Sequence, residues 1–259
     1  MNPVLRENLE VFFGEGHVLK VYYYLLIILA PVQFISLYTS SLGEQMWRGS
    51  GNLFKVCSLT ALLLIVYFAL RVANQEYAPG RFKPLEHWLR DGSQAVGVVA
   101  RGRVAFLLVH IVCLLLLSAP LLLWAAAISR TPLPGIAATL ALIPFYAFCY
   151  GVWGLVASVI WERETEGREF IIRGFIFFVV VAALVVYLPL NPVVYLLAVL
   201  GRQALAPLTI AGVKWSADSL HFSFHLVLGS AGLALHRWAL KQDLQVGHHL
   251  YAKHGDKRS

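Results

Sequence analysis

The sequence predicts an all-α integral membrane protein with six transmembrane helices. Hydrophobic residues make up 59% of its 259 residues, against about 45–50% in soluble globular domains. Charged residues make up 14%, and they stand between apolar runs rather than inside them. A helix needs about 20 apolar residues to cross a bilayer, and six runs can each supply one span. These runs cover approximately 20–38, 53–71, 104–128, 136–160, 172–190 and 219–240.

The distribution of Lys and Arg predicts the orientation of these helices. With the N-terminus on the inside, 16 of the 21 Lys and Arg residues fall on that side. Short loops rich in Lys and Arg stay in the cytoplasm, so we expect both termini and the loop 71–103 to be cytoplasmic. This topology also explains the net charge of +7, so we expect no nucleic-acid partner.

Segment 1–19 predicts a short N-terminal interfacial helix before the first span. Leu5, Leu9 and Phe12 lie at helical spacing, with polar side chains around the rest of the wheel. This pattern is typical of a helix in the membrane interface, and the alternative is a frayed polar tail. The acids near the N-terminus and the lack of a small-residue cleavage site disfavour a signal peptide. We therefore expect the first apolar run to remain as a span.

The loop 71–103 contains a short amphipathic segment. Leu85, Trp88 and Leu89 share one helical face, and Pro84 suits the first position of a helix. The loop therefore predicts a helix of about two turns close under the membrane.

Two interpretations of this short helix remain open. It can lie flat on the bilayer, with Arg81, Lys83 and Arg90 on anionic lipid. Alternatively, it can insert into a groove of a partner protein, with Trp88 as the anchor. Composition alone does not separate the two.

The segment 191–213 follows the fifth apolar run and does not fit a simple span. Pro192 interrupts the helix, and the pair Gly201-Arg202 divides the remainder into pieces too short to cross. An arginine near the middle of the membrane is costly. We therefore predict a re-entrant segment between the fifth and sixth spans, made of two short helices that dip into the outer leaflet.

Catalytic chemistry has little support in the sequence. No GxxxxGK[ST], HExxH or CxxC motif occurs. We therefore expect no ATP site of the P-loop kind and no catalytic residues. The sequence predicts that the chain is not an enzyme. The three cysteines lie in apolar runs and are expected to be small buried hydrophobes. A glutamate cluster alternates with arginines, which favours a solvated cytoplasmic loop with its own ion pairs. Its members are Glu162, Arg163, Glu164, Glu166, Arg168, Glu169 and Arg173.

Four histidines inside apolar runs offer another kind of chemistry. His221 and His225 are four residues apart, on one face of the sixth run. His110 and His236 lie near the cytoplasmic ends of their spans, where two facing imidazoles could bind haem iron. The alternative for all four is a local hydrogen bond near the end of a span. No metal site is otherwise expected.

The order of these features resembles the permease subunits of type-2 ATP-binding-cassette (ABC) exporters, a six-span family that works with a separate ATPase. The chain begins MNPVLRENLE, where that family has an interfacial helix that often opens with Asn-Pro. Gln75-Glu76 stands where the family has an acidic-basic pair, and Pro84-Leu85-Glu86 where its coupling helix contains Thr-Leu-Glu. The basic step Ala100-Arg101-Gly102-Arg103 and the sequence Leu190-Asn191-Pro192 complete the resemblance.

The resemblance implies a transport function in a bacterial inner (cytoplasmic) membrane. It implies a homodimer or a sister permease, contact with membrane lipid, and an ABC ATP-binding subunit that carries ATP and Mg, with no cofactor on this chain. The ATPase-coupling residues would be Glu76, Leu85, Glu86, Trp88 and Leu89. The outer gate would be Asn191, Pro192 and Arg202. Residues 20–240 would form the transmembrane domain and 241–259 a cytoplasmic tail. The alternatives are a haem or quinone redox protein and a non-transporting scaffold.

Overall fold

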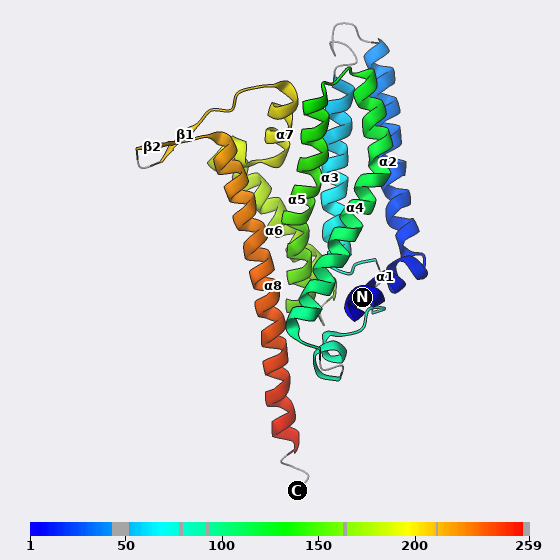
Figure 1. The fold of residues 1–259 in the computed structure, drawn as a ribbon, viewed down its shortest axis with the longest axis vertical. Helices are drawn as coiled ribbons and strands as arrows, with labels where there is room; N and C mark the ends of the chain where they lie inside the picture. The colour runs from blue at the N-terminus through cyan, green and yellow to red at the C-terminus, as the bar shows by residue number, and fades with distance from the viewer. Residues whose placement is uncertain (43–51, 78–79, 92–93, 163–164, 211, 256–259) are drawn as a thin grey trace.

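The computed structural model is a bundle of long helices with short segments at both ends (Figure 1). It describes residues 1–42, 52–77, 80–91, 94–162, 165–210 and 212–255. The helices are α1 Pro3–Leu9, α2 His17–Leu42, α3 Leu53–Ala73, α4 Val96–Ile128, α5 Leu133–Ile160, α6 Thr165–Val186, α7 Pro192–Gly201 and α8 Ala217–Gly255. Two strands, β1 Leu208–Ile210 and β2 Val213–Trp215, form an antiparallel hairpin.

Five helices are long and apolar enough to cross a membrane. They contain the candidate spans Leu19–Tyr38, Leu53–Ala73, Val96–Ile128, Leu133–Ile160 and Gly167–Val186. These spans confirm the first five predicted runs, so the chain is a multi-pass helical membrane protein. α4 begins at Val96 rather than near 104, which places Arg101 and Arg103 on the helix instead of in the loop.

The sixth predicted span lies within α8. Polar residues such as Asp218, His221 and Arg237 lie along this helix, and it is not among the five candidates found by length and composition in the described part of the chain. Its membrane crossing therefore stays a prediction. The backbone of α8 continues to Gly255, where a tail was predicted over 241–259, and residues 256–259 lie outside the described residues.

Close helix packing places α5 at the centre of the bundle, between α3 and α8 (Figure 1). A Cβ atom added to Gly154 of α5 would lie 2.5 Å from the carbonyl oxygen of Leu70 in α3. On the other side, a Cβ on Gly232 of α8 would lie 2.7 Å from Cγ2 of Val152. Glycine therefore allows both neighbours to approach the α5 backbone, as small residues do at membrane helix interfaces.

A short N-terminal helix, α1, is present and is attached to α4, and its place in the membrane interface stays a prediction. The Asn2 side-chain oxygen caps α1 by accepting from the Val4 and Leu5 amides, and its Nδ2 donates to the Val98 carbonyl at 2.7 Å. A π-helical turn, Glu10–Gly14, follows, and the chain turns at Gly16 (φ +74°) into α2. Phe12 of this turn is buried in the core.

The segment 191–213 differs from the prediction of two short helices. Only its first piece, α7, is helical, and it ends at Arg202 in a left-handed conformation with φ 51°. The second piece is extended and leads into the β1–β2 hairpin, which turns near Gly212 (φ +81°). The short length of the two pieces excluded a membrane span, but it did not distinguish a second helix from a β-hairpin.

Candidate functional site

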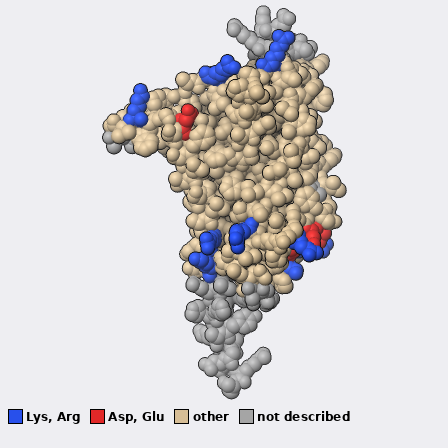
Figure 2. Space-filling view, viewed as in Figure 1, with Lys and Arg blue, Asp and Glu red and all other residues tan. Residues whose placement is uncertain are grey.

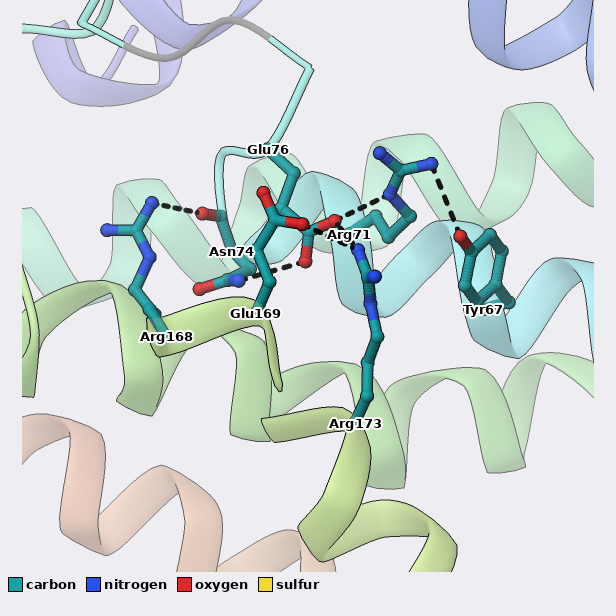
Figure 3. A network of polar contacts seen from close by, with 7 residues as sticks. All are labelled: Tyr67, Arg71, Asn74, Glu76, Arg168, Glu169 and Arg173. Carbon is teal, nitrogen blue, oxygen red and sulfur yellow. Dashed lines mark hydrogen bonds and ion pairs between the residues drawn. The ribbon is translucent and has the colours of Figure 1, made fainter. Parts of the chain in front are cut away.

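A cluster of charged residues joins the C-terminal end of α3 to the N-terminal end of α6 (Figure 3). Its centre is Glu76, whose side chain is fully buried. Its Oε2 atom accepts a hydrogen bond from Nε of Arg71 at 2.6 Å, and a second, short one from Nη2 of Arg173. Arg173 also pairs with Glu169, one turn earlier on α6, at 3.0 Å. One buried carboxylate therefore binds guanidinium groups from two different helices.

The end of α3 places Glu76 in this position. α3 stops at Ala73, and Gln75 takes a left-handed conformation with φ 59° that turns the chain back toward the helix end. Nδ2 of the Asn74 side chain donates to Oε1 of Glu76 at 2.9 Å, and Nη2 of Arg168 donates to the backbone carbonyl of Asn74 at 2.9 Å. Both carboxylate oxygens are therefore hydrogen-bonded, as a buried charge requires.

Two tyrosine rings pack against the Arg71 guanidinium of this cluster. The Arg71 guanidinium carbon lies 4.5 Å from the ring centroid of Tyr77 and 5.4 Å from that of Tyr67, at cation–π distances. Burial raises the pKa of the Tyr77 phenol, so this ring stays neutral beside the arginine.

The short helix predicted in the loop is present, as a turn at 85–86 that continues into the π-helical His87–Asp91. Its apolar side chains, Leu85, Trp88 and Leu89, are buried in one cluster with residues of α1, α4, α5 and α8. The partners in this cluster are Val4, Val99, Val159, Ala239 and Leu240.

Two backbone hydrogen bonds attach this loop to the bundle. The Leu85 amide donates to Oε1 of Glu162, just after α5, at 2.7 Å. The Lys83 amide donates to Oε1 of Glu7, on α1, also at 2.7 Å. Together with the apolar cluster, these bonds make the helix 85–91 part of a continuous layer with α1 and the end of α5.

The structure divides the five predicted coupling residues into two groups. Leu85, Trp88 and Leu89 face the protein interior, and Trp88 is only 8% exposed. Trp88 is therefore not presented as an anchor for a partner, and the half-buried Glu86 and His87 lie on the more accessible side. Glu76 lies in the neighbouring charged cluster.

The predicted gate residues lie at the opposite end of the bundle from α1. The Asn191 side-chain oxygen caps α7 by accepting from the Val193 and Val194 amides, and its Nδ2 donates to the Val180 carbonyl of α6 at 3.0 Å. Pro192 is the first residue of α7. Arg202 ends this helix and lines a pocket of about 410 Å³ beside Asp218. Asn191 thus joins α7 to α6.

The four histidines lie in two different kinds of environment. His221 and His225 are hydrogen-bonded: their Nδ1 atoms contact the carbonyls of Pro189 and His221, and their Nε2 atoms contact the hydroxyls of Tyr146 and Tyr150. Since a carbonyl only accepts, both rings carry the proton on Nδ1 and accept at Nε2. The two contacts with tyrosine attach α8 to α5, and the contact with Pro189 attaches α8 to the turn before α7.

His110 and His236, the possible haem ligands, lie in different surroundings. The His110 ring packs against Phe12 and stacks on Tyr22, whereas His236 lies on α8 beside a groove toward α4. In the described part of the chain, no group of three or more His, Cys, Asp or Glu side chains is placed to hold a metal ion. The redox alternative gains no support from this arrangement.

Sequence reasoning missed most of the charged cluster. The arginines after α5 were expected to pair within a solvated loop, but Arg168 is buried against Asn74 and Arg173 reaches Glu76. The Glu169–Arg173 pair follows that expectation, and Arg163 and Glu164 lie outside the described residues. The spacing of Arg71 and Glu76 was only a weak signal of an ion pair. Side chains five residues apart do not face each other on a continuous helix, so they can pair only if the helix ends between them.

Comparison of the chain with protein-family models, with curated proteins and with solved structures finds no match. Its helices establish a multi-pass membrane protein. A more specific function has to be argued from the charged cluster and the layer beside it.

Proposed function

We propose that this chain is the membrane-spanning permease subunit of an ABC exporter, driven by a separate ATP-binding subunit that carries ATP and Mg. The observation that best supports this proposal is the charged cluster, in which Glu76 joins α3 to α6 beside the helix 85–91. A partner that displaces this helix would move the ends of several spans together. The family resemblance supplies the nature of the partner.

The helix 85–91 has the attachments that transmission of a displacement needs. Its apolar face is packed against α1, α4, α5 and α8, and its first amide is bonded to Glu162. Close-packed contacts of this kind pass on a displacement rather than absorb it. The more accessible Glu86 and His87 would contact the ATPase, and α1 would brace the same surface through Glu7.

The charged cluster can provide two alternative arrangements of α3 and α6. A buried carboxylate must keep a cationic partner, because an uncompensated buried charge costs several kcal/mol. Glu76 has two such partners, Arg71 near the end of α3 and Arg173 on α6. A movement of α6 can release Arg173 to Glu169 while Arg71 keeps Glu76 neutralised. ATP binding then has to favour only one of the two arrangements.

An apolar groove of about 510 Å³ would form part of the cargo route. It lies among α3, α5, α6 and α7, and its lining includes Leu63, Phe177 and Val180, with Arg173 at the edge. Phe177 and Phe178 of α6 are about 70% exposed (71% and 69%), which leaves an apolar face for a second permease copy or lipid. These features fit an amphipathic cargo and a dimer, either a homodimer or one with a sister permease.

The test is co-expression with candidate ATP-binding subunits, purification through a tag on this chain, and reconstitution in liposomes. We expect one such subunit to co-purify and to hydrolyse Mg-ATP. We expect Glu76→Gln to lower ATP-driven transport while the complex still assembles. Failure of every ATP-binding subunit to assemble with the chain would refute the proposal.

A further inference from the structure

A groove of about 630 Å³ lies between α4 and α8, outside the charged cluster and the proposed cargo route. Its lining includes Arg101, Val104 and Leu108 of α4 and Leu233, His236 and Arg237 of α8. The positions on α4 are three and four residues apart, so they lie along one helical face. The groove therefore runs along α4, with charged residues at one end and apolar residues beyond them.

The charged end of the groove carries two cations without acidic partners. Arg101 and Arg237 are both exposed, and neither pairs with a carboxylate among the residues that the structure describes. Arg101 donates to the Gly97 carbonyl of its own helix, at 3.0 Å. Figure 2 shows Lys and Arg gathered at this end of the bundle, below a wide uncharged surface. The charge count places that end at the cytoplasmic leaflet.

A buried histidine gives an independent indication of a ligand. His236 lines the groove and is only 1% exposed. The Leu155 backbone carbonyl approaches its ring, but neither ring nitrogen forms a hydrogen bond of good geometry within the described part of the chain. A buried polar group without a partner is costly. A ligand oxygen in the groove would supply the missing partner.

We propose that this groove binds one anionic phospholipid of the cytoplasmic leaflet. The phosphate lies between Arg101 and Arg237, a headgroup or glycerol oxygen accepts from His236, and an acyl chain follows Val104, Leu108 and Leu233. Basic pockets between transmembrane helices on the cytoplasmic side suit such headgroups. The volume is within the usual range for ligand sites, about 300–1,000 Å³. A soluble anion would leave the apolar wall unused.

Native mass spectrometry of the full chain in detergent tests the proposal, with phosphatidylglycerol and phosphatidylcholine of identical acyl chains as probes. We expect phosphatidylglycerol to bind more tightly. Removing both charges in Arg101→Gln/Arg237→Gln should weaken its binding by about 25-fold, because each cation near the surface contributes about fivefold. The matched control, Arg6→Gln/Lys20→Gln, removes two cytoplasmic cations elsewhere and should leave binding unchanged. Leu108→Trp, which fills the apolar end, should weaken binding of both lipids.

Three results would overturn the lipid assignment. Equal affinity for the two lipids, or a double variant that binds as the wild type does, would remove the role of the arginines. Displacement of phosphatidylglycerol by millimolar inorganic phosphate would make this a site for a free anion. A disulfide between two chains carrying Val104→Cys would place a second copy of the protein in the groove.

Discussion

Glu76→Gln is the substitution for which the structure gives the clearest expectation. The change keeps the shape of the side chain but removes a fully buried charge that binds Arg71 and Arg173. Breaking a buried ion pair costs about 3–5 kcal/mol. The two arginine side chains are 25% and 38% exposed, and Arg173 keeps Glu169. Because solvent screens these arginines, the loss is smaller, and we expect the free energy of unfolding to fall by about 2 kcal/mol.

This loss corresponds to a fall of about 4–8 °C in the unfolding midpoint, at roughly 2–4 °C per kcal/mol for a chain of this size. The assay is a thermal melt of the detergent-purified protein with a thiol-reactive dye, since Cys57 and Cys149 are buried and free. The matched control is Glu10→Gln, which removes an exposed ion pair with Arg6 and should shift the midpoint by about 1 °C or less. Equal midpoints for the two variants would show that Glu76 is not a buried ionic centre.

Three further substitutions test the packing and the polar contacts. Gly154→Val should prevent stable folding, because its Cβ would lie 2.5 Å from the Leu70 carbonyl oxygen. The measurement is the yield of monodisperse protein. The control is Gly167→Ala, whose Cβ would meet nothing within 4 Å and which should keep the wild-type yield. Asn191→Ala removes the α7 cap and the hydrogen bond to Val180. We expect the free energy of unfolding to fall by about 1–2 kcal/mol, measured by thermal melt. An unchanged melting midpoint would contradict the role of Asn191 in joining α7 to α6. His221→Phe leaves the buried Tyr146 hydroxyl without its partner and should cost about 1–3 kcal/mol, whereas Tyr146→Phe in the same background should recover part of that loss.

The spans were predictable because their signal is local. Twenty apolar residues in sequence define a helix that crosses a bilayer, whatever lies around it. The ends of the helices were less predictable, and α4 shows why. Its first turns contain Arg101 and Arg103, which a hydropathy argument assigns to a loop, although polar residues continue a helix readily outside the hydrocarbon.

The charged cluster was less predictable because it joins residues far apart in the sequence. Glu76 follows α3 and Arg173 lies on α6, and the packing of α3, α5 and α6 brings them together. Trp88 presents a related difficulty. Its helical face was correctly predicted to be apolar, but a periodic pattern does not tell whether that face covers a partner, the bilayer or, as here, the protein itself.

Cysteine crosslinking between the helix 85–91 and an ATP-binding subunit tests the central claim most directly. Glu86→Cys and His87→Cys place a thiol on the more accessible side of this helix, and Lys214→Cys in the distant hairpin is the control. The account predicts crosslinks from the first two positions, with a yield that changes when ATP binds, and none from the third. No crosslink from Glu86→Cys or His87→Cys, or an equal yield from Lys214→Cys, would contradict it.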